Sequence, residues 1–274
     1  MSGVLVSSAD FYHSSKFDFI TFKHTKSCSK KLTNFNSHAH SAYEILYIVQ
    51  GSPTYGFEEN SLSLKSGDIL ITPPQQYHFL QVAPNDTYER IGLLLFPKAL
   101  NLDVELDKVI LLSDNHKILR RLIKDFCFYY EHSANDEQRE IFEIKTRELL
   151  FVLNHLLPND DVLANSTVNS TLKNVLDYIN ANLRTSLTVA DISKHCFLSE
   201  GHIHHLFSNK LNTSPMHYIK TKKMLLAQSL ISETDTKQAI TTIAQELGFD
   251  DYSVFYRNYV KFFHRKPSDD LRKD

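Results

Sequence analysis

Short apolar runs fill the first hundred positions of the chain, and turn-forming residues separate them. The runs are rich in β-branched, aromatic and large apolar side chains, with glycine and proline between them. This pattern predicts several short strands joined by tight turns, as in a β-barrel or a β-sandwich. The predicted strands cover residues 17–22, 43–49, 68–72, 77–82 and 90–96.

The periodicity becomes helical after residue 113. Apolar residues recur at helical spacing from Ile118 to Tyr130 and again from Ile141 to Leu156, and Pro158 ends the second stretch. Two consecutive helices of this kind can form an antiparallel hairpin. The hairpin either covers the core of the barrel or provides a dimerisation surface, and the pattern leaves both interpretations open.

A polar stretch at residues 159–170, rich in Ser, Thr and Asn, is typical of a linker. The sequence therefore predicts an α+β protein of two domains: a β-barrel with a helical hairpin at 1–158, and an all-helical domain at 171–274. Helices in the second domain are predicted at 172–183, 189–196, 199–211, 215–231, 239–247 and 252–262, with a short last turn at 267–272.

Charge is divided unevenly between the two domains. The whole chain has a formal net charge of −2, yet residues 170–274 hold 14 Lys and Arg against 11 Asp and Glu. A basic half in an otherwise acidic chain indicates a nucleic-acid partner for that half. Three scattered cysteines, short apolar runs and the lack of a signal-like N-terminus predict a cytoplasmic protein without membrane contact.

Two pairs of short helices, each pair joined by a tight turn, are predicted in the second domain. In the first pair, Ser199 can cap the second helix; in the second pair, Gly248 supplies the turn and Asp250 or Asp251 the cap. A longer helix at 215–231 lies between the pairs. Each pair fits a helix-turn-helix, whose second helix enters the major groove of DNA.

The second domain resembles the DNA-binding domain of the AraC/XylS family of transcription regulators, in which a connecting helix joins two helix-turn-helix units. The matching residues are Leu187, Ile192, Leu198, Ser199, Ile203, Leu206 and Phe207 in the first unit, Ser214, Pro215, Tyr218, Ile219, Met224, Ala227, Leu230 and Ile231 in the connecting helix, and Ile243, Ala244, Leu247, Gly248, Phe249, Ser253, Phe255, Lys261, Phe263, Pro267 and Arg272 in the second. The chain departs from the family's usual residues at Ser193, His205, Asn212, Lys223, Tyr259 and His264. The resemblance implies a regulator that binds promoter DNA as a homodimer, works with RNA polymerase and is not an enzyme.

Helix geometry selects the residues that face DNA, because positions i, i+3 and i+4 share one side of a helix. Arg257 is the candidate for a bidentate contact to guanine, and its alternative is a salt bridge to Asp250 or Asp251. Three histidines, at 202, 204 and 205, suggest that DNA affinity falls as pH rises. Candidate base contacts are Gly201, His204, His205, Tyr252, Ser253, Tyr256 and Arg257, and candidate phosphate contacts are Lys210, Lys222, Lys223, Lys261 and Lys266.

The first domain carries His38-x-His40-x-x-x-Glu44 and, later, Gly67, Pro73 and His78, at spacings that resemble the two motifs of the cupin barrel. Three hypotheses stay open, of which one is that the barrel holds no ligand. Either His38, His40, Glu44 and His78 hold a divalent metal, or they bind a small polar effector such as a sugar together with Tyr47 and Gln76. The first allows a metal-dependent cupin enzyme with a helical appendage; the second gives a ligand-controlled regulator, which the helical domain favours.

Overall fold

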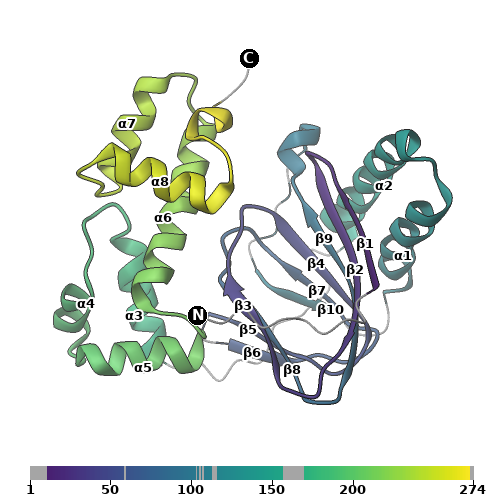
Figure 1. Ribbon diagram of the computed structural model, residues 1–274, viewed down its shortest axis with the longest axis horizontal. Coiled ribbons are helices and arrows are strands. Elements are labelled where there is room, and N and C mark those ends of the chain that lie inside the picture. Colours follow the sequence, from purple (N-terminus) through teal and green to yellow (C-terminus); the bar gives the residue numbers. More distant parts are fainter. Residues whose placement is uncertain are drawn as a thin grey trace. The chain divides into compact units, whose positions relative to one another are not determined.

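The computed structural model describes residues 11–58, 60–102, 104, 106, 108–112, 116–156 and 170–271. The chain forms two compact units (Figure 1). The first contains most of residues 11–156, and the second contains all of residues 170–271. The predicted linker at 159–170 lies outside the described residues, except for Ser170, which begins a helix.

Two β-sheets build the first unit. One has six strands in the order β1-β2-β9-β4-β7-β10, and the other has four in the order β3-β8-β5-β6. A short 3-10 helix, η1 (Pro97–Leu100), follows β9. The strands are β1 Phe11–Lys16, β2 Ile20–Cys28, β3 Thr33–His38, β4 Tyr43–Gln50, β5 Thr54–Phe57, β6 Asn60–Ser63, β7 Ile69–Thr72, β8 His78–Val82, β9 Thr87–Leu95 and β10 Ile110–Leu112.

Four of the predicted strands correspond to β4, β7, β8 and β9, whereas the prediction at 17–22 was wrong in its first half. Residues 17–19 form the turn between β1 and β2, closed by a 2.8 Å hydrogen bond from Phe17 N to Ile20 O. Phe17 and Phe19 are apolar because their rings, 5.6 Å apart, pack in the core rather than because they belong to a strand.

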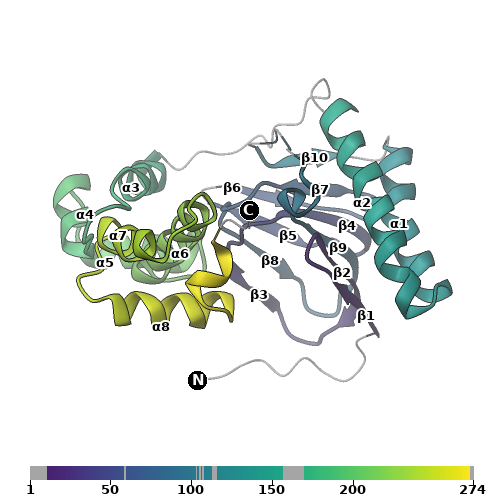
Figure 2. The same ribbon diagram turned by 90° about the horizontal axis from the view of Figure 1, so that it is seen from above.

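A helical hairpin, α1 (Lys117–His132) and α2 (Asn135–Leu156), covers one face of the six-stranded sheet (Figure 2). Phe126 of α1 and Phe142 of α2 have ring centroids 5.1 Å apart, and Phe22 of β2 lies 6.3 Å from the first and 5.7 Å from the second. Burying these rings removes a large apolar area from water. The interpretation that the hairpin covers the barrel core is confirmed, and its role in dimerisation stays a prediction.

Strand parity separates the two faces of the six-stranded sheet. Ile45 and Tyr47 of β4 and Ile91 of β9 pack in the core beneath the hairpin. Since successive side chains of a strand point to opposite faces, the even-numbered Glu44 and Arg90 point into the barrel. The sheet therefore has a dry face toward the helices and a partly polar face toward the barrel interior.

The second unit is helical, and every element lies within two residues of its predicted bounds. Among the described helices, none is long and apolar enough to cross a membrane. The elements are α3 Ser170–Ala181, α4 Val189–Cys196, α5 Glu200–Lys210, α6 Pro215–Ser232, α7 Lys237–Glu246, α8 Tyr252–Phe263 and the 3-10 helix η2 Pro267–Asp270.

Side-chain caps fix the starts of these helices. Thr188 Oγ1 accepts a hydrogen bond from Asp191 N (3.2 Å), and the Asp191 carboxylate accepts one from Thr188 N (2.9 Å), a reciprocal capping box. Hydrogen bonds from Thr188 also lower the pKa of Asp191. Ser199 caps α5 as predicted, and Asp251, rather than Asp250, caps α8. The two short helix pairs thus start where the sequence places them.

The connecting helix α6 belongs to the cores of both helix pairs. Tyr218, near its start, packs edge-on against Phe207 of α5 at 5.5 Å. Met224 and Ala227, further along, are buried with Ile243 of α7 and Phe255 of α8. One continuous helix therefore joins two helix-turn-helix units, α4–α5 and α7–α8 (Figure 1).

Candidate nucleic-acid interface and barrel site

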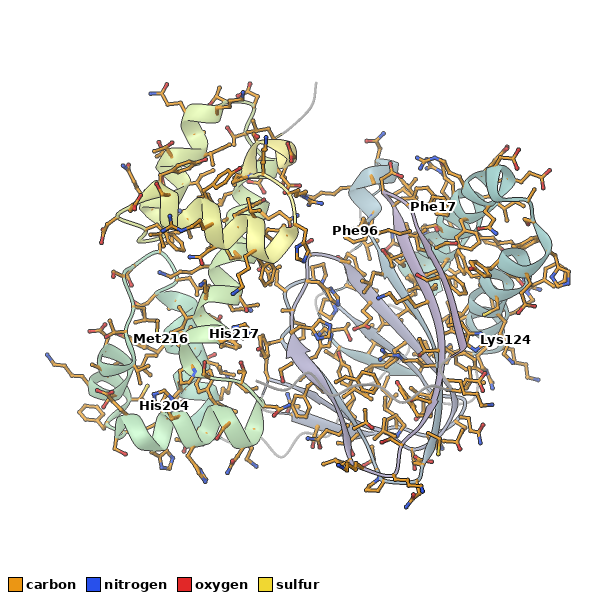
Figure 3. All side chains as sticks on the ribbon, in the orientation of Figure 1. Phe17, Phe96, Lys124, His204, Met216 and His217 are labelled. Atoms are coloured by element: carbon orange, nitrogen blue, oxygen red, sulfur yellow. The ribbon has the colours of Figure 1, made fainter. Side chains whose placement is uncertain are left out.

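The first candidate recognition helix, α5, presents a polar outer side. Ser199 Oγ accepts a hydrogen bond from His202 N at 3.2 Å, which fixes the N-terminal turn. Gly201, His204 and His205 are all exposed, and His204 lies on α5 in Figure 3. His205 Nε2 is 2.9 Å from Asn209 Nδ2, one turn further along. The predicted base-facing residues of the first helix-turn-helix unit, α4–α5, are therefore together at the surface.

The second candidate recognition helix, α8, exposes Tyr252, Ser253 and Arg257, and Tyr256 is half-buried. Ser253 N donates to the Asp251 carboxylate at 2.7 Å. Within the described ranges, Arg257 forms no ion pair with Asp250 or Asp251, the alternative that the sequence left open. Arg257 is therefore exposed on α8, and its contact with a base stays a prediction.

The five candidate phosphate contacts differ in exposure. Lys210, Lys261 and Lys266 are exposed. Lys222 is half-buried, with its ammonium 5.9 Å from the Tyr218 ring centroid. Lys223 is only 7% exposed, and Nζ donates to two backbone carbonyls. The prediction that Lys223 contacts phosphate was wrong, because helical position alone does not show that this ammonium is buried.

A polar cluster lies inside the barrel, where side chains from the two sheets meet. Glu44 of β4 is paired in register with Thr72 of β7. His78 Nε2 lies 2.9 Å from Glu44 Oε2, and the Tyr55 and Thr72 hydroxyls are 2.7 Å apart. The Tyr55 ring stacks on the His78 ring at 5.5 Å. Glu44 and His78, both predicted from spacing, are therefore in contact.

Histidines gather at one side of this cluster. His38, His40 and His78 each offer a ring nitrogen, and these atoms lie within 4.8 Å of one another. Burial increases from exposed His38 through half-buried His40 to His78. His78 Nδ1 donates to the carbonyl oxygen of Gln76 at 2.8 Å, which orients the ring. Three imidazoles at this separation have the composition of a site for a divalent metal.

Tyr47 does not belong to the barrel site. Its side chain packs in the core under the helical hairpin, and the Lys124 ammonium lies 5.6 Å from its ring centroid. The prediction that Tyr47 binds the effector with Glu44 was wrong, since odd and even positions of one strand point to opposite faces. Gln76 contacts the cluster through its backbone carbonyl.

Sequence reasoning missed the residues that complete the interior. The Arg90 guanidinium of β9 lies 4.7 Å from the ring centroid of Phe35 in β3 and 5.7 Å from that of Tyr88. Burial raises the pKa of Tyr88 to about 12, and burial together with the negative charge of Glu44 raises the pKa of Tyr55 well above its ordinary value. Strand parity from Glu44 through the β4–β9 register would have found Arg90, but the register is not visible in the sequence.

Two family descriptions match the chain: an AraC-like ligand binding domain at residues 30–152 and a helix-turn-helix domain at residues 192–273. The chain is 24% identical over 231 residues to the lactose operon transcription activator of Staphylococcus xylosus, with 82% of each chain covered. It is also 24% identical over 230 residues to an uncharacterized HTH-type transcriptional regulator of Staphylococcus aureus strain MSSA476. That match covers 81% of this chain but spans only 30% of the longer relative.

Two solved structures show a distant likeness to the chain. Unsaturated fatty acid-bound ToxT from Vibrio cholerae is 14% identical, with a TM-score of 0.39 and coverage of 95% of this chain and 99% of that chain. The AraC-like transcriptional activator CuxR is 11% identical, with a TM-score of 0.41 and 79% of each chain covered.

Proposed function

The chain belongs to the AraC family of transcriptional regulators, and on that premise we propose that a carbohydrate bound inside the barrel controls its binding to promoter DNA. The family matches lie in both domains and identify a DNA-binding regulator rather than a metal-dependent enzyme. In this proposal the protein acts in the cytoplasm and alters transcription by RNA polymerase.

The polar cluster across the two sheets carries this proposal. Carboxylate, imidazole and hydroxyl groups from Glu44, His78, Tyr55 and Thr72 contact one another inside the barrel. Buried polar groups stay paired, so a ligand that displaces these mutual contacts has to offer several donors and acceptors of its own. Sugar hydroxyls meet that requirement, and the lactose operon activator from S. xylosus, a relative over most of the chain, supports the same ligand class.

Calorimetric titration with lactose, galactose and glucose tests the effector class. The Glu44→Gln variant should bind the preferred sugar about tenfold more weakly or worse, because a hydrogen bond to a charged acceptor is lost. Tyr47→Phe, on the opposite face of the same strand, is the matched control and should bind like the wild type. Stabilisation by an unsaturated fatty acid, with no response to any sugar, would overturn the proposal.

A divalent metal at His38, His40 and His78, with Glu44 as a fourth ligand, is the second candidate for the same site. The observation that favours it is the grouping of three ring nitrogens within 4.8 Å. Elemental analysis of the purified chain should then find close to one zinc, manganese, iron or nickel ion per chain, and His40→Ala should lose it. Metal content that is the same in wild type and His40→Ala would exclude this site.

We propose that α5 and α8 contact base edges in the major groove of DNA. The residues that face the bases are Gly201, His204 and His205 on α5, and Tyr252, Ser253, Tyr256 and Arg257 on α8. Arg257→Ala should cost about 1–3 kcal/mol of binding to a preferred duplex, because a bidentate base contact is lost. Binding to a random duplex and the thermal midpoint should change little, since the side chain is exposed and forms no ion pair with any residue that the structure describes. Equal weakening on both duplexes would assign Arg257 to phosphate contact instead.

The outer face of the α1–α2 hairpin is the proposed homodimer contact. Four large apolar side chains are exposed on it: Ile118 (50%), Phe128 (54%), Ile144 (57%) and Phe151 (62%). Basic residues of α1, among them exposed Lys124 (Figure 3), line a hollow of 550 Å³. Exposed Glu137 and Glu140 lie on α2, so an antiparallel second copy would bring opposite charges together.

Sedimentation equilibrium tests this contact. The double variant Phe128→Glu with Phe151→Glu should be monomeric with an unchanged circular dichroism spectrum, because both side chains are largely exposed in the single chain. A double variant that stays dimeric, or a wild type that is monomeric at all concentrations, would contradict the contact.

A further inference from the structure

Lys223 is a buried ammonium without a carboxylate partner among the described ion pairs. Its side chain, on the connecting helix α6, is 7% exposed. Nζ donates to Thr185 O at 2.6 Å and to Leu247 O at 2.8 Å, and it lies 5.6 Å from the Phe249 ring centroid. An ammonium has three donors; two carbonyls accept from it here, and the aromatic ring lies within cation–π distance.

The two carbonyls belong to different helix-turn-helix units. Thr185 lies in the segment that leads into α4, just before the capping residue Thr188. Leu247 is the C-cap residue that follows α7, at a helix end where carbonyls lack partners within the helix and favour a nearby cation. One ammonium therefore links the segment before the first helix-turn-helix unit to the turn of the second helix-turn-helix unit.

Gly248 brings the same two segments into direct backbone contact. Its φ of +73° lies in the left-handed region, and a Cβ placed on it would be 2.8 Å from Ser186 N and from the carbonyl group of Thr185. Only a residue without a side chain allows this approach. At the outer edge, Arg184 and Glu246 form an ion pair of 2.9 Å. Residues 184–186, 246–248 and Lys223 thus form one continuous contact, here called the Lys223 seam.

We infer that the Lys223 seam holds the two helix-turn-helix units in a fixed position relative to each other. It thereby sets the spacing between the two DNA segments that the chain recognises. Separating the units would break both of these hydrogen bonds and the close backbone contact at Gly248, so the seam favours one fixed arrangement. Burial lowers the pKa of Lys223, since desolvation disfavours its charge. Lys223 is therefore a positioning residue and touches no DNA itself.

If the two helix-turn-helix units are fixed relative to each other, DNA affinity must depend on the distance between the two DNA segments that they bind. One inserted base pair moves the second segment by about 3.4 Å and turns it by roughly 35° around the helix axis. A pair of units joined by α6 alone could follow that shift by bending, whereas units fixed through the seam could not. Spacing tolerance thus separates a positioning role from a merely stabilising one.

The test uses the full chain and a duplex selected from a random-sequence pool by the wild-type protein, with the two protected segments located by footprinting. Binding is then measured on this duplex and on a copy with one base pair inserted between the segments. The wild type should lose about tenfold or more on the inserted duplex, because one unit gives up its base contacts. Lys223→Met should bind the two duplexes with similar affinity, and Lys223→Arg, which keeps the donors, should behave like the wild type.

A Lys223→Met protein that keeps the wild-type loss on the inserted duplex would overturn the inference. If Lys223→Met does not fold, Glu246→Arg decides the matter, since it sets two like charges against each other at the exposed edge of the seam. Glu246→Arg should show a smaller loss than the wild type, and the charge swap Arg184→Glu with Glu246→Arg should restore it. An unchanged loss in Glu246→Arg would count against the seam.

Discussion

Gly201 lies in the first turn of α5, and no contact with the described residues accounts for its missing side chain. A Cβ placed on Gly201 meets no atom within 4 Å. The φ of Gly201 is not in the left-handed region. Gly201→Ala should therefore raise the free energy of unfolding by roughly 0.5–1 kcal/mol. We predict that it also weakens DNA binding, because the added methyl group lies on the proposed base-facing side.

Thermal melts and fluorescence anisotropy with a selected duplex measure both effects of Gly201→Ala. Thr241→Ala, an exposed change on α7 outside both candidate recognition helices, is the control. A more stable Gly201→Ala protein with wild-type DNA affinity would show that the glycine is a neutral position rather than a point of close approach.

Tyr88 makes the barrel sensitive to alkali. Burial raises its pKa to about 12, above the ordinary value of 10.0 for the unfolded chain. The folded state therefore holds a proton that the unfolded state releases, so this contribution is complete below pH 10 and is lost as pH rises through 12. Tyr88→Phe should reduce the fall in stability over that window by roughly 2–3 kcal/mol. Urea unfolding from pH 8 to 11.5 checks this, and parallel curves for the two proteins would refute it.

At the scale of the element, α5 carries three exposed histidines, at 202, 204 and 205. Histidine gains positive charge as pH falls through its titration range, and a positive recognition helix attracts phosphate more strongly. DNA affinity should therefore be higher at pH 6 than at pH 8. The variant with His204→Gln and His205→Gln should lose most of this dependence, and its DNA affinity at pH 8 should also fall because both residues are candidate base contacts. A wild type with constant affinity over this range would end the hypothesis.

The helices could be predicted closely because their start signals are local. Ser199, Thr188 and Asp251 cap helices that begin at the next residue. The strands were harder, since Phe17 and Phe19 have the composition of a strand but form a turn. Register is a non-local property, which is why Arg90 was missed, whereas strand parity alone already sets Tyr47 on the face opposite Glu44. Lys223 shows the same limit, because its burial depends on a turn 24 positions further along the chain.

Control of DNA binding by an effector is a property of the whole chain, and thermodynamics makes it reciprocal. If a sugar changes the Kd for DNA by some factor, DNA must change the Kd for the sugar by the same factor, and such factors are typically about 5–150. Glu44→Gln should remove the effect of the sugar without altering DNA affinity of the unliganded protein, because Glu44 belongs to the barrel and to neither recognition helix.

Two titrations measure this coupling from both ends. Anisotropy gives the Kd for a selected duplex with and without saturating sugar, and calorimetry gives the Kd for the sugar with and without saturating duplex. Each titration gives the ratio of two Kd values. Equal ratios that differ from 1 show that sugar binding and DNA binding are coupled. Sugar binding that leaves DNA affinity unchanged would mean that the barrel cluster binds a ligand without controlling DNA binding. The proposed regulation would then be wrong, although the proposed sugar site would be correct.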